Sequence, residues 1–409
     1  MLRWLSVRDD FVMKYQVASR IGVLGAEAAF IILGRARQLE AEGRSIVHLE
    51  IGEPDFDTPE HIKQAAIKAL EEGYTHYTPT PGLPELREAV AESAKKELGI
   101  DVDWAKNAVI TVGGKEAVFA ALMTLLNPGD EVLYPNPGYP AYESVARLAG
   151  AKTIPIKLRE ENQFRVDPEE LNEMVTRRTK MIVLNSPENP CGSVLTHKDV
   201  KGIAEIAVDK DIYIVSDEIY KHIIYGGSRH FSPAAEPGAL DNTIIVDGFS
   251  KTFAMTGWRL GYLIAPEQVV PPTVTLLNNM TSCPAAFAQK AAVAALRGPM
   301  EPVRKMVQKY EERRRAVVSE VNKIEHLHVF EPPGTFYAFV NAREVLSKAG
   351  MNSEDFCKRT LEKQGVALLH GSAMGSFGEG YVRISFANSV ENIVEGVRRL
   401  ASAVEGVYK

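Results

Sequence analysis

Cysteine is scarce in this chain, with three cysteines among 409 residues. Three cysteines cannot build a disulfide framework, and none has the Cys-x-x-Cys or Cys/His spacing of a metal site. We therefore expect no metal site and a reducing, cytoplasmic location. An excess of charge of one sign is also missing, because 47 basic and 53 acidic residues leave a net charge of -6 without a long basic run. This balance argues against a nucleic-acid-binding protein.

Long apolar runs are absent as well. No run of about 18 or more apolar residues occurs, so we expect nothing to span a membrane. Residues 1–19 carry Arg3, Arg8 and two aspartates, and therefore lack the apolar core of a signal peptide. The densest basic segment, Arg313–Arg315, follows two glutamates on a pattern with helical spacing. We expect these arginines on a solvated helix face rather than in a phosphate site.

The composition is that of a packed globular protein, with 45% hydrophobic and 24% charged residues. A chain of this length exceeds one typical domain, so we expect two packed domains around a cleft. From about Val109, short β-branched runs alternate with helical patterns, which predicts an α/β domain with a mostly parallel sheet and helices on both faces. The predicted strands are Val109–Val112, Glu131–Tyr134, Met181–Leu184, Ile212–Val215 and Thr243–Val246.

The pattern changes beyond Gly298, where a smaller α+β domain is predicted. Its predicted elements are a long amphipathic helix, the strand Phe336–Val340, the helix Glu354–Gln364 and the strand Tyr381–Phe386. An earlier helix, roughly Ala26–Glu42, is expected to pack with this domain. The predicted division is residues 1–53 joining the small domain, residues 54–298 as the large domain, and residues 299–409 as the small C-terminal domain.

The stretch Gly248–Gly261 carries the clearest chemical signal. Lys251 follows an apolar strand and stands among small and apolar residues, which is the environment that favours a neutral, nucleophilic amine. Such an amine can form an imine with an aldehyde. Ser250 adds a hydroxyl, and Arg259 adds a planar fork of donors suited to a phosphate. On local sequence alone, however, a lysine after a strand is usually an exposed residue.

Two further strands end in residues that can bind polar groups. After Val109–Val112, the run Gly113-Gly114-Lys115 opens a helix whose free backbone amides can hold a phosphate, although a plain turn is the alternative. This run lacks both the dinucleotide fingerprint and the nucleotide-triphosphate loop. Asp217 follows another predicted strand, and locally it is equally well explained as a helix N-cap.

Taken together and in order, these motifs resemble the class I aminotransferases of the aspartate aminotransferase type. This family has fold type I and depends on pyridoxal 5′-phosphate. The resemblance extends over nearly the whole chain. It rests on Gly52-Glu53-Pro54-Asp55-Phe56, Tyr77-Thr78-Pro79 with Gly82-Leu83, Gly113-Gly114-Lys115, Asn185-Ser186-Pro187 with Asn189-Pro190-Cys191-Gly192, Asp217-Glu218-Ile219-Tyr220, the stretch around Lys251, and Arg383.

The resemblance implies a role for each matched residue in binding the cofactor. Lys251 would form the Schiff base, and Asp217 would keep the pyridine nitrogen protonated, which makes the ring an electron sink. Tyr220 and Asn189 would hydrogen-bond the 3-oxygen of the ring, and Lys251, Asp217 and Tyr220 are the expected catalytic residues. The other expected cofactor-binding residues are Gly114, Lys115, Tyr139 (stacked on the ring), Ser250, Arg259 and Tyr77. Tyr77 would reach the phosphate in the other subunit of a homodimer.

The resemblance also implies how a substrate is held. Arg383 alternates with Val382 and Ile384 on a predicted strand, so it points away from the apolar face. It would bind the substrate α-carboxylate, together with Gly52 and Asn189. The expected reaction is ping-pong transfer of the amino group of an L-amino acid to 2-oxoglutarate.

Aspartate is the first expectation for the amino donor. However, Asn278 stands where dicarboxylate-specific relatives carry a second arginine, so alanine and aromatic amino acids stay open. A carbon–sulfur β-lyase on the same fold is a further alternative, because fold does not determine the reaction. So is a regulatory protein that keeps the cofactor only as a ligand.

Overall fold

The computed structural model describes residues 17–25 and 27–409, so the expectation for the first sixteen residues lies outside the described residues. Its larger sheet has seven strands in the order β2-β8-β7-β6-β5-β3-β4, and only β8 runs antiparallel to its neighbours. The strands are β2 (Ala108–Thr111), β3 (Glu131–Asn136), β4 (Lys152–Lys157), β5 (Thr179–Asn185), β6 (Tyr213–Asp217), β7 (Thr243–Gly248) and β8 (Gly261–Ile264).

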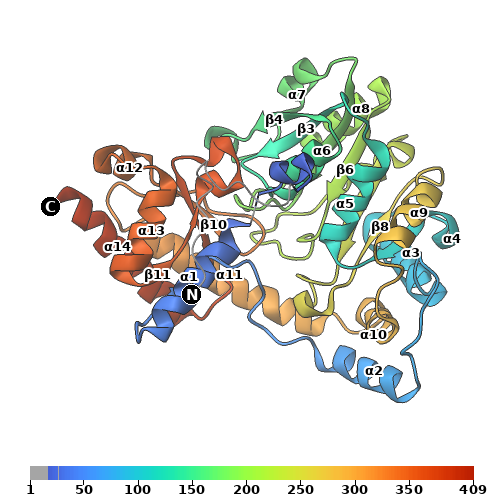
Figure 1. Cartoon of the computed structure of the whole chain (residues 1–409), viewed down its shortest axis with the longest axis horizontal. Coiled ribbons are helices and arrows are strands. Elements are labelled where there is room, and N and C mark those ends of the chain that lie inside the picture. Colours follow the sequence, from blue (N-terminus) through green and yellow to red (C-terminus); the bar gives the residue numbers. More distant parts are fainter. Residues whose placement is uncertain (1–16, 26) are drawn as a thin grey trace.

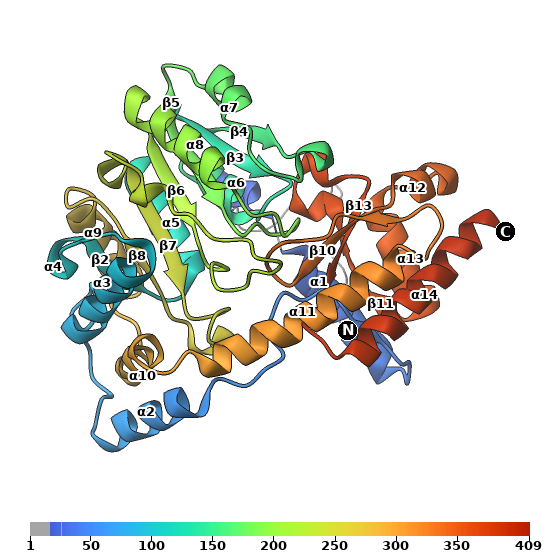
Figure 2. The same ribbon diagram turned by 180° about the vertical axis from the view of Figure 1, so that it is seen from behind.

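Helices cover both faces of this sheet (Figures 1 and 2). Alternate side chains of β5 show the division, because Met181 and Val183 pack in one core cluster and Ile182 and Leu184 in another. The first face carries α5 (Gly114–Leu125), α6 (Ala141–Leu148) and α9 (Val270–Met280). The second carries α3 (Pro84–Leu98), α7 (Pro168–Met174), α8 (His197–Lys210) and α10 (Ala286–Arg297), with α2 (Glu60–Glu71) packed on α10.

All five predicted strands of this sheet are present, so the prediction of a mostly parallel sheet is confirmed. Two strands were not predicted. The segment of β4 carries lysine at both ends and Pro155 inside, which is tolerated because β4 is an edge strand. The segment of β8 follows the Lys251 stretch closely and returns antiparallel between β2 and β7.

The smaller region contains a four-stranded antiparallel sheet in the order β12-β13-β10-β9 and a parallel pair, β1 with β11. Its strands are β1 (Val47–His48), β9 (His328–Val329), β10 (Tyr337–Asn341), β11 (Val366–Ala367), β12 (Leu369–His370) and β13 (Tyr381–Ser385). Its helices are α1 (Ala28–Ala41), α11 (Glu301–Val321), α12 (Arg343–Ala349), α13 (Ser353–Gln364) and α14 (Val390–Tyr408).

Helix α1 packs with this smaller region, as expected. Ala36 and Leu39 of α1 share a small apolar cluster with Leu361 of α13 and Ala367 of β11. None of the helices formed by the described residues has the length and apolar character that crossing a bilayer requires.

The expectation of a solvated face for Arg313–Arg315 is wrong for two of the three residues. Arg313 is buried and forms a bidentate pair with Asp55, at 2.7 and 2.8 Å. Arg314 is buried and pairs with Glu331 at 2.8 Å, whereas Arg315 is exposed as expected. The reason is that α11 runs along both parts of the molecule (Figure 2), and both arginines lie at helical spacing between the buried Tyr310 and Val317, on the covered face of the helix.

Candidate active site

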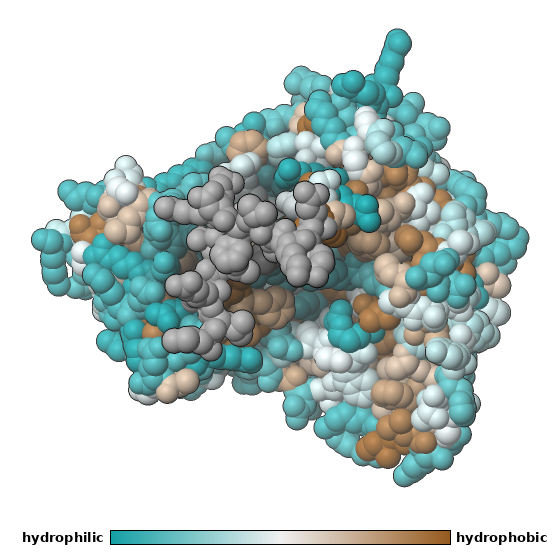
Figure 3. Space-filling model, in the orientation of Figure 1, coloured by the Kyte–Doolittle hydropathy of each residue, from teal (hydrophilic) through white to brown (hydrophobic). Residues whose placement is uncertain are grey.

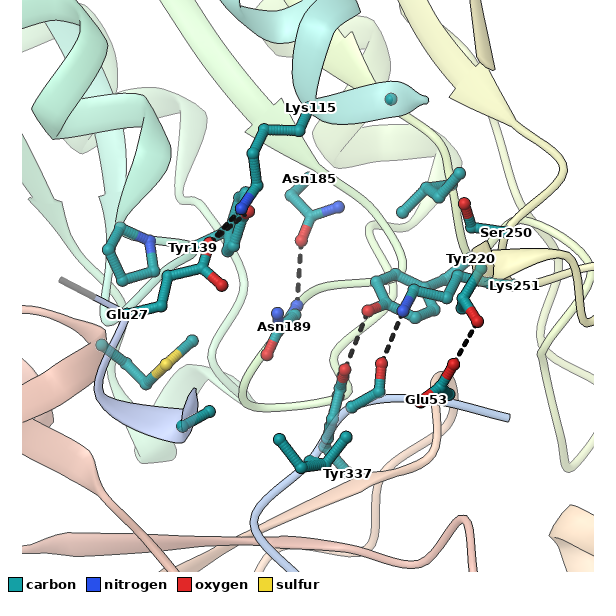
Figure 4. A pocket seen from close by; sticks show the side chains of 18 of the residues that line it. Glu27, Glu53, Lys115, Tyr139, Asn185, Asn189, Tyr220, Ser250, Lys251 and Tyr337 are labelled. Carbon is teal, nitrogen blue, oxygen red and sulfur yellow. Dashed lines mark hydrogen bonds and ion pairs between the residues drawn. The ribbon is translucent and has the colours of Figure 1, made fainter. Parts of the chain in front are cut away.

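A cavity of about 500 Å³ lies at the carboxyl ends of the parallel strands, which is where open α/β sheets bind their ligands. The larger sheet contributes the ends of β5 and β6 and the turn after β7, and the smaller sheet contributes Tyr337 and Arg383. The segment before α2 adds Gly52 and Glu53. Figure 4 shows side chains such as those of Lys251, Tyr337 and Glu53 converging from elements that are far apart in the sequence.

Lys251 stands three residues after the end of β7 and points into the cavity. Its amine donates a hydrogen bond to the Gly52 carbonyl oxygen over 2.5 Å. Burial lowers the pKa of Lys251 to about 8, although the nearby Glu53 carboxylate opposes this shift. A large fraction of the amine is therefore neutral near pH 8, and a neutral amine is the nucleophilic form.

Asp217 is the last residue of β6 and is buried in the cavity wall. Its Oδ2 accepts a hydrogen bond from the Tyr142 hydroxyl over 2.7 Å, and its Oδ1 accepts one from the Ile219 backbone amide over 3.2 Å. Burial raises the pKa of Asp217 to about 6, and the hydrogen bond from Tyr142 opposes that rise. The cavity wall therefore contains a buried carboxyl group whose charge depends on its hydrogen-bond partners.

An anion site is built at the start of α5. Gly113 has φ +80°, and a Cβ there would lie 2.6 Å from a guanidinium nitrogen of Arg259, so only glycine admits this arginine. The backbone amides of Gly114 and Lys115 begin the helix beside that guanidinium, and the buried Ser250 lines the same cavity. Helix-start amides, a guanidinium and a hydroxyl together suit a phosphate group.

The side chain of Lys115 is turned away from this anion site toward the outer part of the cavity. Its ammonium pairs with the Glu27 carboxylate, which also accepts a hydrogen bond from the Tyr139 hydroxyl over 2.9 Å. The Tyr139 ring lines the cavity and packs edge-on against Tyr142, with ring centroids 5.6 Å apart. Lys115 thus offers its backbone amide, and not its ammonium, at the helix start.

Arg383 lies on β13 and is buried. One of its terminal nitrogens donates to Asn189 Oδ1 over 3.0 Å, and the other donates to the Glu50 carbonyl oxygen over 2.6 Å. Its Nε has no partner among the described residues, and its guanidinium carbon lies 4.3 Å from the centre of the Tyr337 ring. A buried cation with an unused donor at a cavity wall suits a carboxylate ligand.

Tyr220 and Asn189 also line the cavity. The Tyr220 hydroxyl lies 2.9 Å from the Tyr337 hydroxyl, and the Asn189 backbone amide donates to Asn185 Oδ1 over 2.9 Å. Tyr77, by contrast, is 90% exposed and is not part of the cavity of this single chain. The structure therefore brings together every expected site residue except Tyr77.

Several residues that line the cavity were missed by the sequence analysis, among them Tyr142, Tyr337 and Glu27. Tyr142 lies on the apolar face of α6, where a tyrosine is usually a core residue. Tyr337 begins an apolar strand, and Glu27 precedes α1 without any motif. A signal existed only for Tyr337, because a strand tyrosine between Phe336 and Phe339 has a hydroxyl that must find a partner when buried.

Comparison with known proteins agrees with this geometry. The family described as aminotransferase class I and II matches residues 44–400. The chain belongs to this family. The resemblance and the fold type I prediction are thus confirmed, and this aminotransferase depends on pyridoxal phosphate.

The aminotransferase is similar to proteins that are named for different amino acid substrates. It is 45% identical over 395 residues to an aspartate aminotransferase of Pyrococcus horikoshii, covering 96% of this chain and 98% of the relative. It is 43% identical over 362 residues to aromatic-amino-acid aminotransferase 2 of Thermococcus litoralis, covering 88% of this chain and 92% of the relative. Among solved structures, the aspartate aminotransferase from Thermus thermophilus with maleate has a TM-score of 0.89 and 36% identity, covering 95% of this chain and all of that chain.

The residues of this aminotransferase fit pyridoxal phosphate. The anion site at α5 suits the phosphate, the buried Asp217 suits a protonated ring nitrogen, and the Lys251 amine suits an aldehyde carbon. The buried Nε of Arg383, which has no partner among the described residues, is left for a substrate.

Proposed function

We propose that this aminotransferase transfers the amino group of L-aspartate to 2-oxoglutarate in a ping-pong reaction centred on Lys251. The observation that carries the proposal is the convergence, in one cavity, of the Lys251 amine with its lowered pKa, the buried Arg383 and the anion site at α5. The names of the Pyrococcus horikoshii and Thermus thermophilus relatives support aspartate as the amino donor, and the latter structure contains the dicarboxylate maleate.

Each cavity residue receives one task under this proposal. Bound pyridoxal phosphate supplies an aldehyde that condenses with amines and a ring that accepts electrons from the substrate α-carbon. The helix start at Gly114 and Lys115, with Ser250 and Arg259, holds its phosphate, and Tyr139 stacks on its ring. Asp217 keeps the ring nitrogen protonated, while Tyr220 and Asn189 donate hydrogen bonds to the 3-oxygen.

The substrate is held by its α-carboxylate and is deprotonated at its α-carbon. Arg383 binds the carboxylate, with Gly52 and Asn189 beside it, and this orients the α-hydrogen toward Lys251. The Lys251 amine would then remove the α-proton, because its pKa of about 8 keeps a fraction of it neutral at neutral pH. Release of the keto acid before the second keto acid enters gives ping-pong kinetics.

The amino donor is the open part of this proposal. Asn278 is exposed and accepts a hydrogen bond from Thr80 over 3.2 Å, outside the cavity of this single chain. A distal carboxylate therefore finds no arginine at that position. Aromatic amino acids are the second candidate, because the Thermococcus litoralis relative bears that name. Alanine, and β-elimination of a sulfur-containing amino acid, are the remaining alternatives.

The test is the absorbance spectrum of the purified holoenzyme, compared with that of Lys251→Ala. We expect a visible band that requires Lys251, bleaches with L-aspartate and returns with 2-oxoglutarate. A band that responds only to aromatic amino acids or alanine would reassign the donor. Release of ammonia and pyruvate instead of amino transfer would identify a β-lyase. A spectrum without a Lys251-dependent band would refute the proposal.

We also propose a cytoplasmic homodimer in which Tyr77 reaches the cofactor phosphate of the partner subunit. Tyr77 is 90% exposed, and Ile67 and Leu70 of α2 and Met280 of α9 are exposed apolar side chains. Apolar residues gather at the end of the molecule formed by α2 (Figure 3), as they do on surfaces covered in an assembly. The three cysteines form no disulfide among the described residues, which fits this location.

The division into domains is a further proposal. Residues 54–298 contain all seven strands of the larger sheet, and residues 299–409 contain five of the six strands of the smaller region. The sixth, β1, lies within residues 1–53 and pairs with β11, which supports assigning that segment to the small domain.

A further inference from the structure

The hydroxyl groups of Tyr220 and Tyr337 form a buried pair at the cavity wall. Their oxygens lie 2.9 Å apart, and both side chains are buried (Figure 4). Tyr220 follows β6 of the larger sheet, whereas Tyr337 begins β10 of the smaller sheet. This contact therefore joins the two halves of the active site at the residue expected to touch the cofactor.

The Tyr337 hydroxyl is confined to this position. A Cβ on Gly52 would lie 1.9 Å from the Tyr337 oxygen, so glycine is required to leave room for it. The Tyr337 ring also faces the Arg383 guanidinium, whose carbon lies 4.3 Å from the ring centre. With its ring and its hydroxyl both held, Tyr337 has little freedom to turn its oxygen toward another partner.

Proton counting decides what the pair can do. A phenol has one proton to donate, and neither hydroxyl has another hydrogen-bond partner among the described residues. Burial raises the pKa of both phenols, and the Arg383 cation opposes that rise in each, so both hydroxyls keep their protons. In the proposed function the single proton of Tyr220 is donated to the 3-oxygen, so the Tyr220 oxygen can only accept from Tyr337, and Tyr337 is the donor of the pair.

We propose that Tyr337 is a positioning residue for amino transfer, whose hydroxyl donates to the Tyr220 oxygen and directs the Tyr220 proton into the cavity. This inference rests on the proposed function, in which Tyr220 donates to the 3-oxygen of pyridoxal phosphate. Hydrogen bonds in a chain strengthen each other, so a donor behind Tyr220 makes Tyr220 a stronger donor. The smaller sheet thereby tunes the cofactor without touching it.

The test is a pH titration of the visible band of the holoenzyme. In Tyr337→Phe, the ring and its contact with Arg383 stay, but the donated hydrogen bond is lost. Tyr220 then stabilises negative charge on the 3-oxygen less well, so the apparent pKa of the band should rise by roughly 0.5 pH unit. Tyr220→Phe should raise it further, by about 1 unit or more.

Two controls separate positioning from a general structural effect. Tyr310→Phe removes a buried hydroxyl that has no partner among the described residues, in the same apolar cluster, and should leave the pKa of the band unchanged. The double variant Tyr220→Phe/Tyr337→Phe should titrate like Tyr220→Phe alone, because Tyr337 acts only through Tyr220.

The outcomes are distinct. If the apparent pKa of the band is unchanged in Tyr337→Phe, the role of Tyr337 is overturned and the proposed function stays intact. The same holds if Tyr337→Phe still shifts this pKa in the Tyr220→Phe background. A wild-type protein without a Lys251-dependent band would remove the proposed function and this inference together.

Discussion

The Lys251 amine donates a hydrogen bond to the Gly52 carbonyl oxygen over 2.5 Å, although 199 residues separate the two in the sequence. Gly52 also leaves the space that the Tyr337 hydroxyl occupies. The segment before α2 therefore closes the cavity over the amine and contributes to its burial. This burial is the main reason that the pKa of Lys251 falls to about 8.

The lowered pKa of Lys251 should cost the cofactor-free protein stability at neutral pH. An unfolded lysine binds a proton below pH 10.5, but the folded one binds it only below about pH 8. Between these values the unfolded state binds more protons, so stability should rise with pH across this window. At pH 7, the free energy of unfolding of Lys251→Met should exceed that of the wild type by up to about 3 kcal/mol.

Chemical denaturation of the two cofactor-free proteins at pH 7 and pH 10 measures this difference. The difference between the two free energies of unfolding should be smaller at pH 10, where the wild-type amine is neutral in the folded state. Lys201→Met, on an exposed face of α8, should show no such pH dependence. A Lys251→Met variant less stable than the wild type at pH 7 would contradict the argument.

Gly113→Ala should weaken binding of pyridoxal phosphate by roughly tenfold or more, because its Cβ would push Arg259 from the helix start. Gly129 is the matched control. Gly129 has φ +94°, but a Cβ there would have no neighbour within 4 Å. Gly129→Ala therefore introduces backbone strain without displacing any side chain. Fluorescence titration of each cofactor-free variant with pyridoxal phosphate measures the affinity, and equal losses in both would remove Arg259 from the explanation.

Tyr142→Phe should raise the pKa of Asp217 above its value of about 6, because the hydroxyl that stabilises the carboxylate is lost. The acid limb of the pH dependence of pyridoxal phosphate binding to the cofactor-free protein should move to higher pH by about 0.5–1 unit. Tyr134→Phe is the control, since the Tyr134 hydroxyl contacts Asn136 and not Asp217. Identical acid limbs in Tyr142→Phe and the wild type would show that Tyr142 does not tune Asp217.

The sequence was sufficient for features that depend on local pattern. The central runs of β5 (Met181–Leu184) and β7 (Ile244–Val246) are apolar because helices cover both faces of the sheet, and this pattern is visible in the sequence alone. The Lys251 stretch and the order of the short motifs indicated the family in the same way. By contrast, β4 begins and ends in lysine and contains a proline, so its strand character comes from pairing with β3.

The contacts between the two halves of the molecule could not be predicted. Glu27 and Tyr337 enter the cavity only because the smaller region packs against the larger sheet, and no local pattern marks that contact. The same limitation explains Arg313 and Arg314. Their charge suggested an exposed face, but both continue the buried stripe of α11, where Asp55 and Glu331 reach them from distant segments.

The Arg313–Asp55 pair should stabilise the protein measurably. Its two parallel hydrogen bonds are half-buried, and the guanidinium lies 4.8 Å from the Phe56 ring. Lysine cannot reproduce this fork, so Arg313→Lys should lower the free energy of unfolding by about 1–2 kcal/mol in urea denaturation. Arg315→Lys changes an exposed pair on the same helix and should cost less than about 0.5 kcal/mol. Equal effects of the two substitutions would contradict the role of the fork.

A shared active site predicts that two inactive variants restore each other. Lys251→Ala lacks the amine in its own cavity, whereas Tyr77→Ala lacks the side chain proposed to reach into the partner's cavity. In a hybrid dimer, one cavity then carries both defects and the other carries none. Random mixing makes about half of the dimers hybrids with one intact site of two, so activity should recover to about a quarter of the wild-type level.

The measurement is amino transfer after the two variants are mixed, mildly dissociated and reassociated. Activity should appear only after dissociation, because exchange of subunits is required. Mixing Lys251→Ala with Asp217→Ala is the control, since both residues lie in the same cavity of one chain and every hybrid site stays defective. If the Tyr77→Ala mixture recovers no more activity than this control, Tyr77 does not act across the subunit boundary, and its 90% exposure needs another explanation.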